Sequence, residues 1–219
     1  SFFDGVRLDG VTIDTSAAAG PGGSIDIIGN GTTIPFQLVH YSDGDGGYDS
    51  LEFALDYGLA VNGGSDINAG GGNINLNGTG GVGVAIGQGP GPLNRVRTTG
   101  TGYIYVSGGA QIEPTGGDGG IWGSYTSQFY NGSFGGVTIQ SGALETALGG
   151  VTVKGKMNDI NSPAGGFGLN LVQTQSTPTI TTQGGAVSLD GQSRGGFAAW
   201  MSQVQAPVKL FGTQIVTNG

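Results

Sequence analysis

The sequence predicts an all-β fold, a right-handed parallel β-helix (β-solenoid) with coils of roughly 20 residues and loop excursions. Short runs of alternating apolar and polar residues recur along most of the 219 residues, and glycine opens each of them. Alternation with a period of two is typical of a strand with one buried face. A short unit of strands that repeats along the chain is typical of a stacked solenoid, in which each coil buries its apolar face against its neighbours.

Six runs carry the alternation most clearly. They span residues 23–29, 72–78, 136–140, 150–154, 166–171 and 185–190. The glycines that open the last four runs lie at positions 136, 150, 166 and 185, and we interpret the interval between successive glycines as one coil. The chain would then form about eleven coils and, at about 4.8 Å for each strand, a rod about 50 Å long. Parallel crossovers favour a right-handed helix.

Turns and departures from the repeat are also predicted. Asn-Gly pairs at residues 30–31, 77–78 and 131–132 are predicted to reverse the chain, because glycine accepts a positive φ without steric cost. Residues 35–64 and 119–134 lack the clean pattern, so we expect them to leave the rod. Within the first of these, residues 51–57 alternate as a strand does. Residues 208–216 are expected to form a strand edge at one end of the solenoid.

Composition favours a folded chain. Glycine accounts for 49 residues and proline for 8, yet charged residues are only 10% and hydrophobic residues 36% of the chain. This differs from the high charge and low hydrophobicity of disordered segments, so the glycines are interpreted as punctuation between strands. We expect one solenoid domain over residues 1–219, either complete or a segment of a longer secreted protein.

Charge and cysteine content exclude several functions. A net charge of -8 and a pI near 4.2 oppose binding to nucleic acid. The chain contains no apolar run of the roughly 20 residues that cross a bilayer, so no membrane span is expected. The absence of cysteine excludes disulfides, thiol nucleophiles and zinc-thiolate sites, and is consistent with a large bacterial exported protein.

The densest acidic group contains Asp43, Asp45, Asp49 and Glu52 on a glycine-rich stretch. Alternating carboxylates of this kind can supply the oxygen ligands of a calcium ion. The spacing is not that of an EF-hand, because the sixth position counted from Asp43 is Tyr48 rather than glycine. The other interpretation is a solvated loop whose aspartates hydrogen-bond their own backbone. Calcium is the one cofactor that the sequence suggests.

A second candidate site is aromatic. Trp122, Tyr125 and Tyr130 lie in one polar stretch, where exposed rings could stack on sugar rings or anchor a protein partner. The same side chains could instead cap one end of a coil or pack beneath a loop. The sequence leaves both interpretations open.

Catalytic patterns are missing, so we do not expect an enzyme. His40 is the single histidine, so any Ser-His-Asp triad would need it as its base. Inverting glycosidases place two carboxylates across a cleft, but the paired Asp-Asp, Gly-His and Arg-x-Lys motifs of β-helical pectin hydrolases do not occur. The alternative function to a structural or adhesive role is a β-helix that binds or cleaves polysaccharide.

Four stretches carry a family resemblance. They read VTIDTSAAAG at residues 11–20, GGSIDI at 22–27, GGNINLNG at 71–78 and TQGGAVSLDG at 182–191. This texture resembles the filamentous-haemagglutinin-like exoproteins. The resemblance implies a right-handed parallel β-helix that crosses an outer membrane, often by two-partner secretion, and acts in adhesion, aggregation or biofilm formation.

The expected location and partners follow from that resemblance. It implies a secreted or bacterial cell-surface protein that contacts a host or neighbouring cell surface or a glycan. The Asn-Pro-Asn-type signatures of that family's secretion domain are absent, so the chain would correspond to part of the shaft or to a shorter relative. Because the terminal coils of a solenoid expose strand edges, we also expect end-to-end association between copies.

Overall fold

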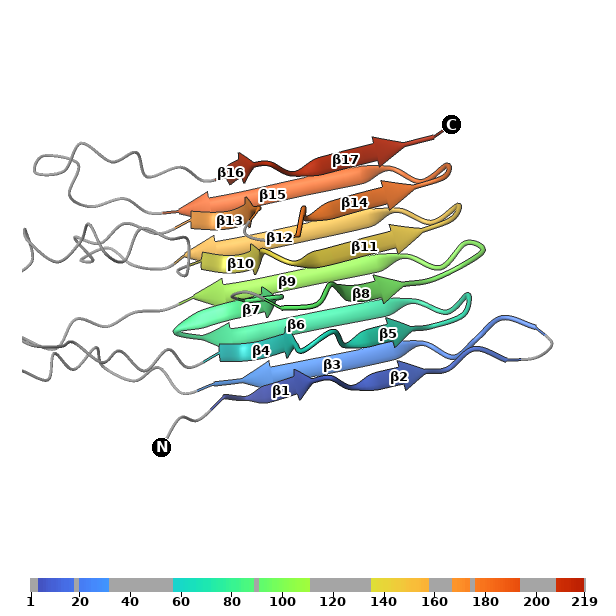
Figure 1. The fold of residues 1–219 in the computed structure, drawn as a ribbon, viewed down its shortest axis with the longest axis horizontal. Helices are drawn as coiled ribbons and strands as arrows, with labels where there is room; N and C mark the ends of the chain where they lie inside the picture. The colour runs from blue at the N-terminus through green and yellow to red at the C-terminus, as the bar shows by residue number, and fades with distance from the viewer. Residues whose placement is uncertain are drawn as a thin grey trace, which may run out of the picture.

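The protein is a parallel β-helix. The computed structural model describes residues 4–17, 20–31, 57–88, 91–110, 135–157, 167–173, 176–193 and 208–218. Their regular structure consists entirely of strands, which form three parallel sheets. Successive coils lie one above the next along the stack (Figure 1). The predicted fold class is therefore confirmed.

Each coil contributes strands to the sheets in turn. Sheet A contains β1 (Val6–Asp9), β4 (Tyr57–Asn62), β7 (Val82–Ile86), β10 (Gly135–Ile139), β13 (Phe167–Val172) and β16 (Val208–Phe211). Sheet B contains β2 (Thr12–Asp14), β5 (Asp66–Asn68), β8 (Asn94–Arg97), β11 (Gly142–Thr146), β14 (Thr179–Thr182) and β17 (Gln214–Thr217). Sheet C contains β3 (Ile25–Asn30), β6 (Ile74–Gly80), β9 (Ile104–Ala110), β12 (Val151–Met157) and β15 (Val187–Ser193).

The predicted number of coils is wrong, as is the interpretation of the glycine intervals as whole coils. Sheets A and B each have six strands and sheet C has five, so the described residues form six coils, the last without a described strand in sheet C. Leu59 pairs with Val84, and Val84 pairs with Val137, so successive coils differ widely in length. The glycine intervals lead from a strand of sheet A to one of sheet C and on to the next strand of sheet A, so each covers only part of a coil. Five steps of about 4.8 Å give a stack about 24 Å high.

The extra length of the chain is concentrated at the corner between sheets C and A. There, β6 and β7 are separated by Gly81 alone. The other four connections at this corner contain residues 32–56, 111–134, 158–166 and 194–207, which lie outside the described residues. The predicted excursions at 35–64 and 119–134 fall largely within the first two, as does the strand predicted at 51–57, except for Tyr57. The end of the first excursion is corrected, because residues 57–62 form β4 in the shaft.

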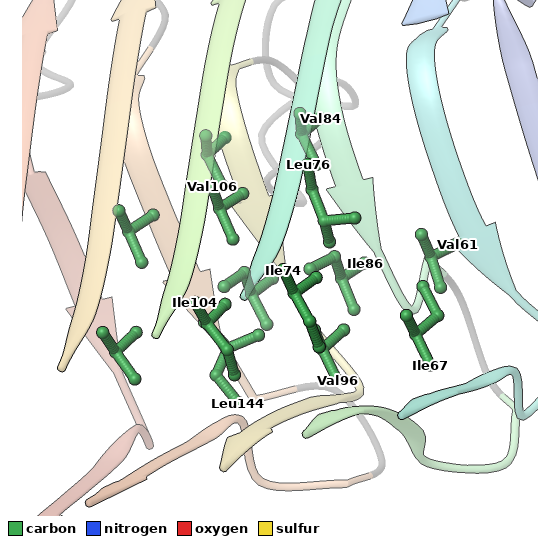
Figure 2. Close-up of a cluster of buried hydrophobic side chains, with 14 of the residues drawn as sticks. Val61, Ile67, Ile74, Leu76, Val84, Ile86, Val96, Ile104, Val106 and Leu144 are labelled. Atoms are coloured by element: carbon green, nitrogen blue, oxygen red, sulfur yellow. The ribbon is translucent and has the colours of Figure 1, made fainter. Parts of the chain in front are cut away.

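The interior is filled by columns of apolar side chains. In sheet B, Ile67, Val96, Leu144 and Ile180 pair in register from coil to coil, and each is at most 1% exposed. Side chains from sheets A and C meet this column inside the helix (Figure 2). Burying a side chain of this size contributes about 1.5–3 kcal/mol. The alternating runs in the sequence therefore predict correctly which residues of sheet C point inward.

Glycine also forms a column inside the helix. Gly29, Gly78, Gly108, Gly155 and Gly191 pair in register within the strands of sheet C. They face a second set of glycines in the strands of sheet A, which are Gly58, Gly83, Gly136 and Gly168. A Cβ on Gly155 would lie 1.9 Å from the carbonyl oxygen of Gly168, and a Cβ on Gly78 would lie 2.1 Å from that of Gly83. We call these two columns the glycine seam, because the backbones of sheets A and C meet there with no room for a side chain.

The prediction that the Asn-Gly pairs reverse the chain is wrong for the pair at residues 77–78. Asn77 and Gly78 lie inside β6 rather than at a chain reversal, and neither Gly31 nor Gly78 has a positive φ. Glycines with a positive φ occur instead at the other corners, as at Gly63 and Gly87. The third pair, at residues 131–132, lies outside the described residues.

Threonine and asparagine hold the two remaining corners. Between sheets B and C, the hydroxyl groups of Thr98, Thr146 and Thr182 donate to glycine carbonyl oxygens at 2.5–2.6 Å, and all three residues are nearly inaccessible. Between sheets A and B, the side chain of Asn94 bonds to backbone groups of neighbouring coils. Each corner therefore satisfies backbone groups that would otherwise be buried without a partner.

Candidate functional surface

The predicted site residues lie outside the part of the chain that the structure describes. Asp43, Asp45, Asp49 and Glu52 belong to residues 32–56, as does His40. Trp122, Tyr125 and Tyr130 belong to residues 111–134. Both segments begin after a strand of sheet C and end at a strand of sheet A, so their attachment points lie along the same edge of the helix. Calcium binding and aromatic recognition at these residues stay predictions.

The described residues hold no group of three or more His, Cys, Asp or Glu side chains that could bind a metal ion. Within the same ranges, no helix is long and apolar enough to cross a membrane. The surfaces of the described residues that could bind a partner are the outer faces and the ends of the three sheets.

The outer face of sheet B carries an ion pair between neighbouring coils. Asp66 accepts two hydrogen bonds from Arg97, at 3.0 Å from Nε and 2.7 Å from Nη2. The hydrogen bond to Asp66, with smaller contributions from Glu145 and Asp14, raises the pKa of Arg97. Hydrogen bonds from Ser16 lower the pKa of the Asp14 carboxyl. The positive charge of Arg97 is therefore compensated by neighbouring acidic side chains.

The outer face of sheet A is buried. Ala60 and Ala85 are completely inaccessible although they alternate with inward residues, and together with Tyr57 and Val82 they form a second apolar cluster. Thr138, in the same column, is also inaccessible. Burial raises the pKa of Tyr57. Sheet A is therefore covered on both sides, and its outer face is not an accessible binding surface in the middle coils.

The outer face of sheet C is accessible and chemically distinct. Tyr103, just before β9, is 42% exposed, and Tyr105 in β9 is half-buried on the same side. Lys154 and Lys156 project as exposed residues from β12, which pairs with β9. We call these four residues the Tyr-Lys patch. Sequence reasoning missed it because its tyrosines occupy the outward positions of a repeat strand rather than a segment of unusual composition.

Neighbouring coils fix the geometry of the patch. The Lys154 Nζ atom lies 5.9 Å from the centroid of the Tyr105 ring, within the range of a cation–π interaction. Asn75 and Thr152 flank Tyr105 in register. The backbone N–H of Tyr103 donates to Oδ1 of Asn73 at 3.2 Å. The two rings and two ammonium groups therefore share one pleated surface across two coils.

Among the described residues, the strands at the two ends of the stack pair on one side only. As expected for residues 208–216, β16 and β17 occupy the outermost positions of sheets A and B. Leu210 is 49% exposed and Ile215 is 40% exposed, although both belong to inward-facing columns. At the opposite end, β1, β2 and β3 are the outermost strands of their sheets.

These features define the class of the protein as a parallel β-helix with accessible faces on sheets B and C. A scan against protein-family models found no match. Searches of curated proteins and of solved structures also found no match.

Proposed function

We propose that the protein is an extracellular or cell-surface structural β-solenoid, which acts as an adhesin shaft, a biofilm component or a self-assembling fibre unit. Its supports are the continuous apolar interior, the hydrogen bonds of Asn94 and Thr98 between neighbouring coils, and the outermost described strands, which pair on one side only. Outermost strands present rows of unpaired N–H and C=O groups that favour the addition of further strands.

The proposal depends most on the difference in solvent exposure between inward residues of the same column. Ile180 is 1% exposed, whereas its partner Ile215 in the last strand of sheet B is 40% exposed. In sheet A, Leu171 is inaccessible and its partner Leu210 is 49% exposed. A further coil stacked on sheets A and B would bury both exposed side chains.

The first coil of a second copy offers apolar residues that would cover these exposed side chains. In β1 and β2, Leu8 and Ile13 are half-buried residues that pack against the core from the inward face. They belong to the same columns as Leu210 and Ile215. Association of the last coil of one copy with the first coil of another would therefore continue sheets A and B with apolar residues inside.

Sedimentation velocity over a wide range of protein concentration tests this association. We expect particles that lengthen with concentration while the β-sheet circular dichroism is unchanged. Ile215→Lys should keep the chain monomeric, because it places a charge in the apolar contact.

Leu148→Lys is the matched control. Leu148 is 63% exposed on the turn between β11 and β12, away from the ends of the stack, so this substitution should leave assembly intact. Strict monomers at every concentration, or equal loss of assembly in both variants, would contradict end-to-end association.

A further inference from the structure

We propose that the Tyr-Lys patch on sheet C binds an acidic polysaccharide. The inference deepens the adhesive side of the proposed function and rests on it, but it does not require end-to-end association. The patch consists of Tyr103 and Tyr105 from one coil and Lys154 and Lys156 from the next.

The tyrosines supply an apolar surface for sugar rings. Residues two apart on a strand lie about 6.8 Å from each other on the same face. Tyr103 is 42% exposed and Tyr105 is half-buried, so ring surface remains accessible in the unbound protein. Tyrosine combines a flat apolar body with a polar tip, which suits the C–H face and the hydroxyl groups of a pyranose.

The lysines supply the preference for acidic sugars. Both are exposed, and the two ion pairs among the described residues join Arg7 with Asp4 and Arg97 with Asp66. Neither lysine is therefore neutralised by an ion pair within the described part of the chain. The position of Lys154 beside the Tyr105 ring places positive charge next to the surface on which a sugar would stack. A uronate carboxylate on that sugar would meet the Lys154 ammonium group, and Lys156, two residues further along β12 on the same face, would meet the carboxylate of a following sugar.

Acidic residues limit the extent of the patch. Asp26 in β3 is exposed on one side, where its carboxylate accepts a hydrogen bond from the Asn75 amide. Asp190 in β15 is exposed on the other side and pairs in register with Lys154. With a net charge of -8, the protein repels polyanions elsewhere, so binding should be confined to these two coils and weakened by salt.

The test is calorimetric titration of the unmodified protein with polygalacturonate and, separately, with neutral dextran. We expect saturable binding to polygalacturonate that weakens as salt is added, and much weaker binding to dextran. Tyr103→Ala combined with Tyr105→Ala should lower the affinity about tenfold, whereas the two phenylalanine substitutions should largely preserve it. Lys154→Gln combined with Lys156→Gln should remove most of the salt dependence.

Arg95→Gln is the control for charge, because Arg95 is an exposed cation on sheet B, away from the patch. It should leave the affinity unchanged. Absence of binding to polygalacturonate, equal affinity for dextran, or equal effects of the arginine and lysine substitutions would overturn the inference. If polygalacturonate binding fails but the unmodified chain still assembles, the glycan inference is wrong and end-to-end association is retained. If assembly fails but polygalacturonate still binds, end-to-end association is wrong and the glycan inference is retained.

Discussion

Gly108→Ala is expected to lower the free energy of unfolding by about 3 kcal/mol, at the upper end of the usual cost of overpacking. A Cβ at this position would lie 1.8 Å from the carbonyl oxygen of Gly136 and 2.6 Å from its carbonyl carbon. Both atoms are backbone, so no rotamer change can relieve the overlap, and sheets A and C would have to separate. Urea unfolding followed by circular dichroism, with linear extrapolation to water, measures the loss.

The neighbouring residue provides the control. Gly109 lies in the same strand but on its outer side, and a Cβ there would meet only the Thr79 methyl group at 3.6 Å. Because alanine restricts the unfolded chain more than glycine does, Gly109→Ala should be neutral or more stable by up to about 1 kcal/mol. Equal losses in the two variants, or no loss in Gly108→Ala, would show that sheets A and C are not in backbone contact.

The sequence predicts the strands better than their stacking. Alternation is local, so residues such as Ile25 and Ile27 reveal their inward side without knowledge of any partner. Pairing is not local, because the connections from sheet C to sheet A range from Gly81 alone to residues 31–56. A fixed spacing between glycines therefore could not give the coil length.

A more specific signal was present in the sequence. The pattern Gly-x-Ile/Val-x-Ile/Leu/Val-x-Gly occurs at residues 23–29, 72–78, 102–108, 149–155 and 185–191, which overlap the five strands of sheet C. Its first glycine begins the strand region and its last lies in the glycine seam. Interpreting glycine as punctuation between strands concealed the seam, because a glycine required by close approach and one required by positive φ are identical in sequence.

The candidate site was harder to predict than the fold. Attention to unusual composition selected the acidic and aromatic segments, which lie outside the described residues. The Tyr-Lys patch arises because β9 and β12 pair in register, although Tyr105 and Lys154 are far apart in sequence. Only the register places these side chains together.

Asn94→Ala is expected to lower the free energy of unfolding by about 3 kcal/mol, because buried polar groups lose their partners. Asn94 is 1% exposed. Its Oδ1 atom accepts hydrogen bonds from the backbone N–H groups of Gly64 and Ser65, at 3.1 and 3.0 Å, and its Nδ2 atom donates to the carbonyl oxygen of Ser141 at 3.1 Å. One side chain thus joins the coil below and the coil above its own.

Asn77→Ala is the matched control for this prediction. Asn77 is half-buried on the outer side of β6, so truncating it should change stability by no more than about 0.5 kcal/mol. Chemical denaturation of both variants gives the comparison. Because Asn94 connects three coils, its loss should also make unfolding less cooperative, with a smaller dependence on denaturant than in the unmodified chain. Similar stability losses in the two variants would mean that the asparagine at this corner does not hold the coils together.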